Sequence, residues 1–400
     1  MIFVKTENLK TGMRLAKPIY NKNGVLLYDR NSKLTLPGIN SVRNFGLIGV
    51  YILEPAEPLP PLSREDLEFE QLHTIYFFRL REILDLILKK KPLDDFVPFL
   101  EDIIRKYGSL SHRVNFNQNH RSSEDFMYKH AISTAILVTM MTSRLDFSHE
   151  KQLTMVASAL LYDIGYRYVP KVILEKGGQL EKGDRDIIQQ SLEKGLHFLS
   201  AYQNSFDFMP QTSALCAAYI YSTNPNKALS PDPSVQAMMG ILRVADNFDQ
   251  LTAMNLGHEP KSELMAMEFL KKHPDAFDPK LVSTLAECIH IAPHAASVDL
   301  ANGNKGIILV ENPVDYLHPV ILNINDNKLY DLSDPSVSSD FQIVDIMKTM
   351  DNRIHISPET IKNFMPDKRL EEITKKFNQD LTIANVRKKS SQQSLADSYH

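Results

Sequence analysis

Residues 152–164 read QLTMVASALLYDI, and their apolar side chains recur with the 3.6-residue period of an α-helix. Segments of the same kind occupy most of residues 124–291. A domain built from such segments buries one face of each helix in a shared core. We therefore predict a mainly α protein, in which an all-helical domain is flanked by a small N-terminal β-rich domain and a C-terminal extension of β-hairpin and helix.

Changes in composition along the chain predict five segments. Residues 1–60 are expected to form the β-rich domain, because Asn23-Gly24 lies between two short apolar runs and is a strong hairpin signal. Residues 61–123 are expected to form a helical linker segment that leads into the helical domain of residues 124–291. Residues 292–385 form the extension, with a second hairpin signal at Asn302-Gly303. Residues 386–400 are rich in Ser, Gln and Lys and are predicted to be a disordered tail.

The composition excludes several classes of partner and location. The net charge of −4 argues against a nucleic-acid partner, since binding to a phosphate backbone needs a basic surface. The two cysteines, Cys216 and Cys288, are too few for a disulfide framework or a thiolate metal site, which fits a reducing compartment. The longest apolar stretch, residues 131–141, is too short to span a bilayer, and charged residues interrupt the N-terminus before a signal peptide could form. We predict a cytoplasmic protein without membrane insertion.

One predicted helix, which ends in the lysines of residues 89–91, carries a narrow apolar stripe. The side chains of the stripe fall three or four residues apart and form one face: Leu72, Tyr76, Leu80, Ile83 and Ile87. Two interpretations are open. The stripe packs on its own chain, or it forms a coiled-coil-like contact between two copies. The second interpretation is the basis for a predicted homodimer through residues 72–87.

The motif that includes Asp163 resembles a known family. Residues 159–166, ALLYDIGY, are similar to the LLHDIGK signature of HD-GYP domains, which belong to the HD phosphohydrolase superfamily and include cyclic-di-GMP phosphodiesterases. Residues 241–252, ILRVADNFDQLT, resemble the family signature RI-L-x-VAD-x-FDALT, and residues 277–282 resemble FDP-x-LV. The sequences LKTGM at residues 9–13 and VDLANGNKG at residues 298–306 resemble segments found before and after such domains. The resemblance therefore spans most of the chain, in order.

This resemblance implies a catalytic centre of two or three iron or manganese ions, held by His and carboxylate side chains, that polarises a phosphate and activates a water. Three positions of the centre keep their ligand: His130, Asp163 and Asp246. Tyr162 stands in place of the histidine of the HD pair, Tyr166 in place of a lysine, and Ser191 in place of a later histidine. Residues 214–236, where the family has HHE-x-x-x-GYP, contain neither a histidine nor that signature.

Two interpretations of His130, Asp163 and Asp246 follow from this loss. In the first, the three residues are a hydrogen-bonded relic that stiffens the helix packing, with no cofactor and no catalytic residue. In the second, the three residues hold a single Fe or Mn ion. The first interpretation predicts a pseudoenzyme: a regulatory or scaffolding module that binds protein partners in bacterial cyclic-di-GMP-type signalling and binds cyclic-di-GMP weakly or not at all. The alternative is an active metal-dependent phosphohydrolase that acts on cyclic-di-GMP or another nucleotide through a reduced, single-metal site.

Other histidines are not expected to add a metal site. His112 and His120 lie in a polar, irregular segment, residues 109–123, and are expected to face solvent. His290 and His294 are four residues apart, but Pro293 lies between them and argues against a helix that would pair them. We expect structural or surface roles for both.

Overall fold

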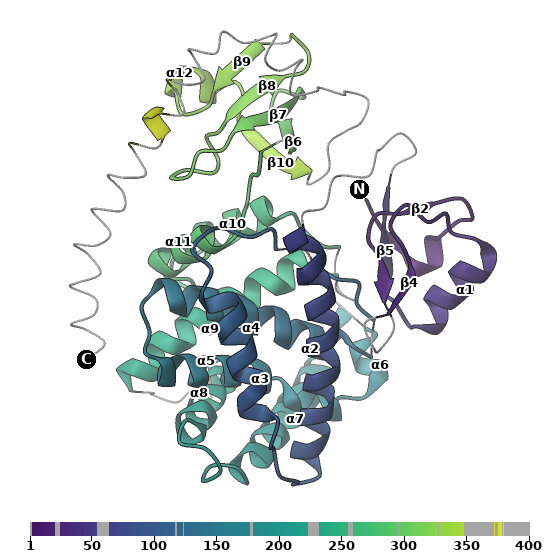
Figure 1. The fold of residues 1–400 in the computed structure, drawn as a ribbon, viewed down its shortest axis with the longest axis vertical. Helices are drawn as coiled ribbons and strands as arrows, with labels where there is room; N and C mark the ends of the chain where they lie inside the picture. Colours follow the sequence, from purple (N-terminus) through teal and green to yellow (C-terminus); the bar gives the residue numbers. More distant parts are fainter. Residues whose placement is uncertain are drawn as a thin grey trace.

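The computed structural model places an N-terminal β-rich unit, a central group of helices and a C-terminal sheet in succession along the chain (Figure 1). This arrangement confirms the predicted fold class. The structure describes residues 2–20, 25–53, 64–116, 118–122, 124–176, 179–222, 232–254, 259–294, 296–326, 328–347, 372, 375–377 and 379. The predicted disordered tail, residues 386–400, and the Asn23-Gly24 pair lie outside the described residues.

The N-terminal unit combines a small sheet with a helix. Strands β1 (Ile2–Lys5), β5 (Gly49–Leu53) and β2 (Arg14–Leu15) pair antiparallel in the order β1-β5-β2, and β3 (Ile19–Tyr20) pairs with β4 (Leu26–Tyr28). Between them lie the short 3₁₀ helix η1 (Thr6–Asn8) and α1 (Leu36–Asn44), a helix that the β-rich prediction omits. Helix α1 begins at Thr35, whose hydroxyl accepts a hydrogen bond from the backbone N–H of Gly38.

Helix α4 (Phe126–Arg144) lies at the centre of the helical region. It packs against α2 (Arg64–Leu88), α5 (His149–Leu161), α9 (Pro233–Thr252) and α11 (Pro279–Cys288). Every residue from 130 to 142 is buried, because this stretch presents small or apolar side chains on all sides. The remaining helices complete the shell: α3 (Phe96–Ile103), η2 (Ile104–Gly108), η3 (Ile164–Tyr168), α6 (Lys171–Leu174), α7 (Lys182–Ser200), α8 (Met209–Tyr221) and α10 (Glu263–Lys272).

Local sequence signals set the ends of the helices that carry the predicted site. Ser148 before α5 and Asp232 before α9 each accept a hydrogen bond from a backbone N–H three residues further on. After α5 the chain turns into η3, where Gly165 lies directly against α7. A Cβ on Gly165 would lie 2.4 Å from the Cα of Leu192 and from the carbonyl oxygen of Ser191, so only glycine permits this approach.

The apolar stripe of α2 is buried within its own chain. Tyr76, Leu80, Ile83 and Ile87 are each at most 2% exposed and belong to the same hydrophobic core as α4 and α5. The structure therefore favours the first interpretation, in which the stripe packs on its own chain, while the prediction of a homodimer through residues 72–87 stays untested. Helix α3 joins the same core. Within residues 61–123, α2 and α3 thus pack into the helical domain, and the described residues from 109 to 122 form no helix.

The C-terminal region is a larger sheet than the predicted hairpin. Strands β6 (Ser297–Leu300), β7 (Lys305–Val310), β8 (Val320–Asn323), β9 (Lys328–Asp331) and β10 (Ile343–Met347) pair antiparallel in the order β10-β6-β7-β8-β9. The predicted Asn302-Gly303 turn connects β6 to β7, and Gly303 has a φ of +81°, which glycine adopts without strain. A short helix, α12 (Pro335–Ser338), follows β9.

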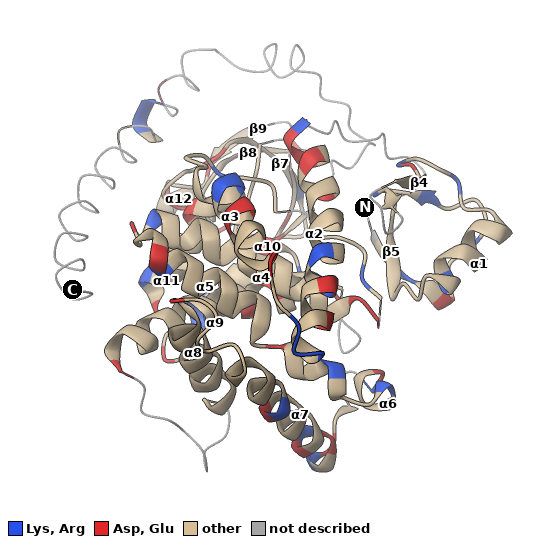
Figure 2. Cartoon of the chain, turned by 60° about the horizontal axis from the view of Figure 1, so that its bottom comes forward, with Lys and Arg blue, Asp and Glu red and all other residues tan. Residues whose placement is uncertain are grey.

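Charged side chains of both signs are mixed on the outer helices. Figure 2 shows acidic and basic residues along the same helices, for example α2 and α7, in agreement with the small net charge of −4. Within the ranges given above, no helix combines the length and the apolar character needed to cross a membrane.

Candidate functional site around His130

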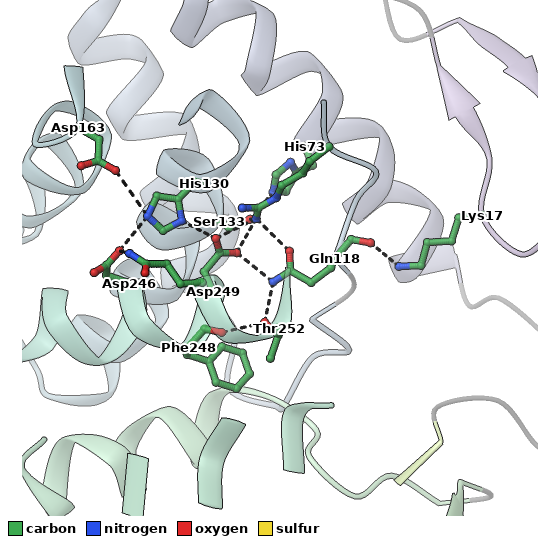
Figure 3. Close-up of polar contacts among 12 residues, drawn as sticks. Lys17, His73, Gln118, His130, Ser133, Asp163, Asp246, Phe248, Asp249 and Thr252 are labelled. Carbon is green, nitrogen blue, oxygen red and sulfur yellow. Dashed lines mark hydrogen bonds and ion pairs between the residues drawn. The ribbon is translucent and has the colours of Figure 1, made fainter. Parts of the chain in front are cut away.

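The structure brings together the three residues that the sequence singles out (Figure 3). His130 lies on α4, Asp163 directly follows α5, and Asp246 lies on α9. The Nε2 atom of His130 is 2.8 Å from Oδ1 of Asp246 and 3.7 Å from Oδ2 of Asp163. Residues that are 116 positions apart in the sequence therefore share one buried site.

His130 has partners at both ring nitrogens. Nδ1 lies 2.5 Å from Oδ2 of Asp249, while Nε2 lies 2.7 Å from the hydroxyl of Tyr162 in addition to Asp246. Burial by itself lowers the pKa of His130, but the hydrogen bonds to Asp246 and Asp249 outweigh burial and raise the pKa to about 10. The imidazole is thus a buried cation between two carboxylates. In this state both ring nitrogens donate hydrogen bonds.

Asp246 is surrounded by donors. Its Oδ1 accepts hydrogen bonds from the hydroxyl of Tyr162 at 2.9 Å and from Nε2 of Gln250 at 2.8 Å, and its Oδ2 accepts one from the hydroxyl of Tyr219. Burial raises the pKa of Asp246, but the hydrogen bonds from His130, Tyr219 and Tyr162 lower it overall, so the carboxylate stays ionised. Burial, together with the neighbouring carboxylates, holds the pKa of both tyrosines well above the usual value. The two phenols therefore remain protonated donors.

Arg121 and Asp249 form a second buried ion pair next to that of His130 and Asp246. Asp249 is 0% exposed and accepts hydrogen bonds from Nη2 of Arg121, at 2.7 and 2.9 Å to its two oxygens, and from Nε2 of Gln118 at 2.9 Å. Burial raises the pKa of Asp249, yet the charges of Arg121 and His130 lower it far below the usual value. Two cations, Arg121 and His130, therefore balance two carboxylates, Asp246 and Asp249, inside the helical domain.

Asp163 differs from the other two carboxylates of the site. Its side chain is 13% exposed and lies 3.7 Å from Nε2 of His130, beyond hydrogen-bond distance. Burial raises the pKa of Asp163 to about 7, although the charge of His130 acts in the opposite direction. The tightly connected part of the site is thus the chain of contacts from Asp246 through His130 to Asp249 and Arg121.

Four further residues of the site were not predicted from the sequence: Asp249, Arg121, Gln118 and Tyr219. A signal for Asp249 was present, because a residue three positions after Asp246 lies on the same face of a helix. Gln118 and Arg121 come from an irregular segment before α4, and nothing local marks them. Tyr219 lies on α8, and only the packing of α8 against α9 brings its hydroxyl to Asp246.

The structure also shows where three of the other histidines lie. His112 is exposed, as expected. His120 is 7% exposed, so the prediction that it faces solvent is wrong: the N-terminal unit covers it, and its ring stacks on the ring of Tyr51 with 5.8 Å between centroids. His290 lies 3.1 Å from Glu311 and has the expected structural role.

The residues at this site do not fit the metal cluster that the family resemblance implies. Across the described ranges, no group of three or more His, Cys, Asp or Glu side chains is arranged to hold a metal ion. The hydroxyl of Tyr162 bridges His130 Nε2 and Asp246 Oδ1, and both of these residues are among the ligands that the resemblance implies. At Ser191, where the resemblance places a further histidine, a buried hydroxyl stands instead.

Comparisons with known proteins point to the same region of the chain. Residues 116–281 match the family described as HD domain. An alignment of 200 residues is 22% identical to a cyclic di-GMP phosphodiesterase of Pseudomonas aeruginosa and covers 50% of this chain and 48% of that protein. The chain therefore spans about half the length of the curated relative that it matches. No solved structure matches the chain. Residues 116–281 are therefore similar to an HD domain, and about half of the chain is related to a cyclic di-GMP phosphodiesterase.

Proposed function

We propose that this protein is a catalytically inactive HD-type protein that acts as a regulatory or scaffolding module in bacterial cyclic-di-GMP-type signalling, through contacts with protein partners. A single observation carries the proposal: carboxylates lie at both ring nitrogens of His130, Asp249 at Nδ1 and Asp246 at Nε2, and the hydroxyl of Tyr162 bridges His130 and Asp246. In this arrangement the retained ligand residues neutralise one another. Their role is to hold α4 and α9 together.

The chemistry of phosphodiester cleavage supports this proposal. Metal-assisted hydrolysis needs ions that lower the pKa of a water and neutralise charge on the phosphate. Each divalent ion needs several free N or O donors. Here both ring nitrogens of His130 lie within hydrogen-bond distance of carboxylates, and the carboxylate of Asp246 already accepts hydrogen bonds from Tyr162, Tyr219 and Gln250. Activating a water would first require breaking this buried network.

We also expect weak binding of cyclic-di-GMP, because most of the metal ligands and a lysine of the family are replaced in this sequence. In the family that the sequence resembles, the phosphates of the ligand contact the metals and basic side chains. Tyr166 stands where that family has a lysine, and burial raises the pKa of its phenol, which stays neutral. Without charge-assisted contacts, little offsets the desolvation of two phosphates. We expect a dissociation constant weaker than about 1 μM by calorimetry (about −8 kcal/mol), and tighter binding would contradict the proposal.

The deciding experiment combines metal content with turnover. The protein is purified anaerobically, its iron and manganese are measured by elemental analysis, and hydrolysis of cyclic-di-GMP to the linear dinucleotide and GMP is followed with either metal added. We expect metal well below one equivalent and no turnover above the enzyme-free control. Asp163→Ala and a control at an exposed aspartate, Asp95→Ala, are assayed alongside. Metal-dependent turnover that Asp163→Ala abolishes and Asp95→Ala retains would overturn the proposal and favour the single-metal phosphohydrolase.

A further inference from the structure

The connecting segment, residues 118–122, is buried although it contains no helix and only an isolated β-bridge at Ser122. Gln118, Arg121 and Ser122 are each at most 5% exposed. Buried irregular chain must find partners for its polar groups in other parts of the protein. The connecting segment finds partners on two sides, since the N-terminal unit lies on one side and the ion pairs around His130 lie on the other (Figure 3).

The N-terminal unit holds the backbone of the connecting segment. The Nζ atom of Lys17 donates a hydrogen bond to the carbonyl oxygen of Gln118 at 2.6 Å. The backbone N–H of Ile48 donates one to the carbonyl oxygen of Arg121 at 2.7 Å. Lys17 is 8% exposed, and its ammonium lies 5.1 Å from the ring centre of Tyr51. Because a buried charge is costly unless it is paired or hydrogen-bonded, the contact of Lys17 with Gln118 stabilises the docked position of the N-terminal unit.

The side chains of the same segment hold the site. Nε2 of Gln118 donates hydrogen bonds to Oδ1 of Asp249 and to the hydroxyl of Thr252, each at 2.9 Å. Nη2 of Arg121 donates to both oxygens of Asp249, at 2.7 and 2.9 Å. Oδ2 of Asp249 in turn lies 2.5 Å from Nδ1 of His130. Gln118 and Arg121 therefore each contact the N-terminal unit through the backbone and Asp249 through the side chain.

We infer that the docked N-terminal unit and the ion pairs around His130 form one cooperative unit, so that displacing the N-terminal unit disrupts the ion pairs. Without the N-terminal unit, the carbonyl oxygens of Gln118 and Arg121 lose two donors, and the connecting segment loses part of the cover that excludes water. Two charges attract each other much more weakly in water than in a protein interior, so Arg121 then holds Asp249 less tightly.

The coupling makes the N-terminal unit a regulatory element. A partner that binds only the displaced N-terminal unit shifts the equilibrium towards the disrupted site, by as much as its affinities for the two states differ. The inference does not depend on whether the site is catalytic, so it stands or fails independently of the proposed function.

Native-state hydrogen exchange of the ¹⁵N-labelled full chain tests the coupling. One reporter is the backbone N–H of Ile48, and the other is the ring N–H at Nδ1 of His130, whose signal is identified by its loss in His130→Gln. The amides of residues 134–140, in the middle of α4, report global unfolding. We expect the two reporters to share one dependence of exchange on urea, weaker than that of the α4 amides, because both exchange through one partial opening. Different urea dependences for the two reporters, or global unfolding as the route for both, would overturn the inference.

A substitution in the N-terminal unit gives a second test. Lys17→Met keeps the length of the side chain and removes the donor to Gln118, so it should speed exchange of the His130 ring proton about tenfold. Lys17→Arg keeps a donor and should exchange at close to the wild-type rate. The matched control is Lys33→Met, at an exposed lysine of the same unit, which should leave the rate unchanged. An unchanged rate in Lys17→Met would contradict the coupling, since the site would then open while the N-terminal unit stays docked. If Lys17→Met fails to fold, the urea dependence in the wild-type protein decides.

Discussion

Replacing Asp249 by asparagine should destabilise the protein strongly, although the change preserves the shape of the side chain. The carboxylate is 0% exposed and accepts hydrogen bonds from Arg121, from Gln118 and from Nδ1 of His130. The Asp249→Asn change removes the negative charge and leaves Arg121, 1% exposed, as a buried cation without its counter-ion. Breaking a buried pair in this way costs about 3–5 kcal/mol.

This loss is large relative to the stability of ordinary proteins, about 5–15 kcal/mol. For a domain of 150–250 residues, 1 kcal/mol shifts the melting temperature by about 2–4 °C. We therefore expect the melting temperature to fall by about 6–20 °C in Asp249→Asn, as measured by circular dichroism of the helices. Urea unfolding followed by the same signal should give a lower midpoint with a similar slope.

The control is Asp102→Asn, which removes a helical aspartate that also contacts arginine. The side chain of Asp102 is 26% exposed, and Nη1 of Arg79 lies 3.6 Å away. Ion pairs that stay in contact with solvent contribute about 0–1 kcal/mol. A melting temperature in Asp249→Asn as close to wild type as that of Asp102→Asn would refute the reasoning, because it would mean that the buried ion pairs do not stabilise the helical domain.

Other consequences of the geometry are open to test. Tyr162→His should raise bound iron or manganese towards one equivalent while turnover of cyclic-di-GMP stays near background, with Tyr162→Phe as the control that binds no additional metal. Burial lowers the pKa of His73 and of His120 to about 3, below the value of about 6.5 in an unfolded chain. Between these two pH values the unfolded state binds more protons than the folded state. The free energy of unfolding should therefore fall as the pH drops from about 6.5 to 3. His73→Gln should reduce the slope of the free energy of unfolding against pH by at most about 1.4 kcal/mol per pH unit in this window, and an unchanged slope would contradict the burial of a neutral ring. Leu80→Glu should unfold the helical domain because Leu80 is 0% exposed, whereas Leu67→Glu, at a position 40% exposed on the same helix, should melt close to wild type.

The positions of the site residues could be predicted, but their interactions could not. The resemblance of residues 159–166 and 241–252 to HD-GYP signatures identified Asp163 and Asp246, and the structure places both beside His130. The same residues suggested a metal site as one alternative. The hydrogen bonds that they make in the structure involve the hydroxyl of Tyr162, which is itself part of the motif, and groups far from it in the sequence. The charge of an imidazole depends on all of its neighbours, so no motif of a few residues determines it.

By itself, the sequence determined the helical character of residues 124–291 and the hairpin turn at Asn302-Gly303. These features depend on periodicity, caps and turn residues that act over a few positions. Only the tertiary structure decided that the stripe of α2 is covered by its own chain and that His120 is buried under the N-terminal unit. It also decided that Arg121 pairs with Asp249, 128 positions away. Contacts of this kind form because separate elements pack against one another. A pattern of neighbouring residues does not specify which distant side chain each of them will contact.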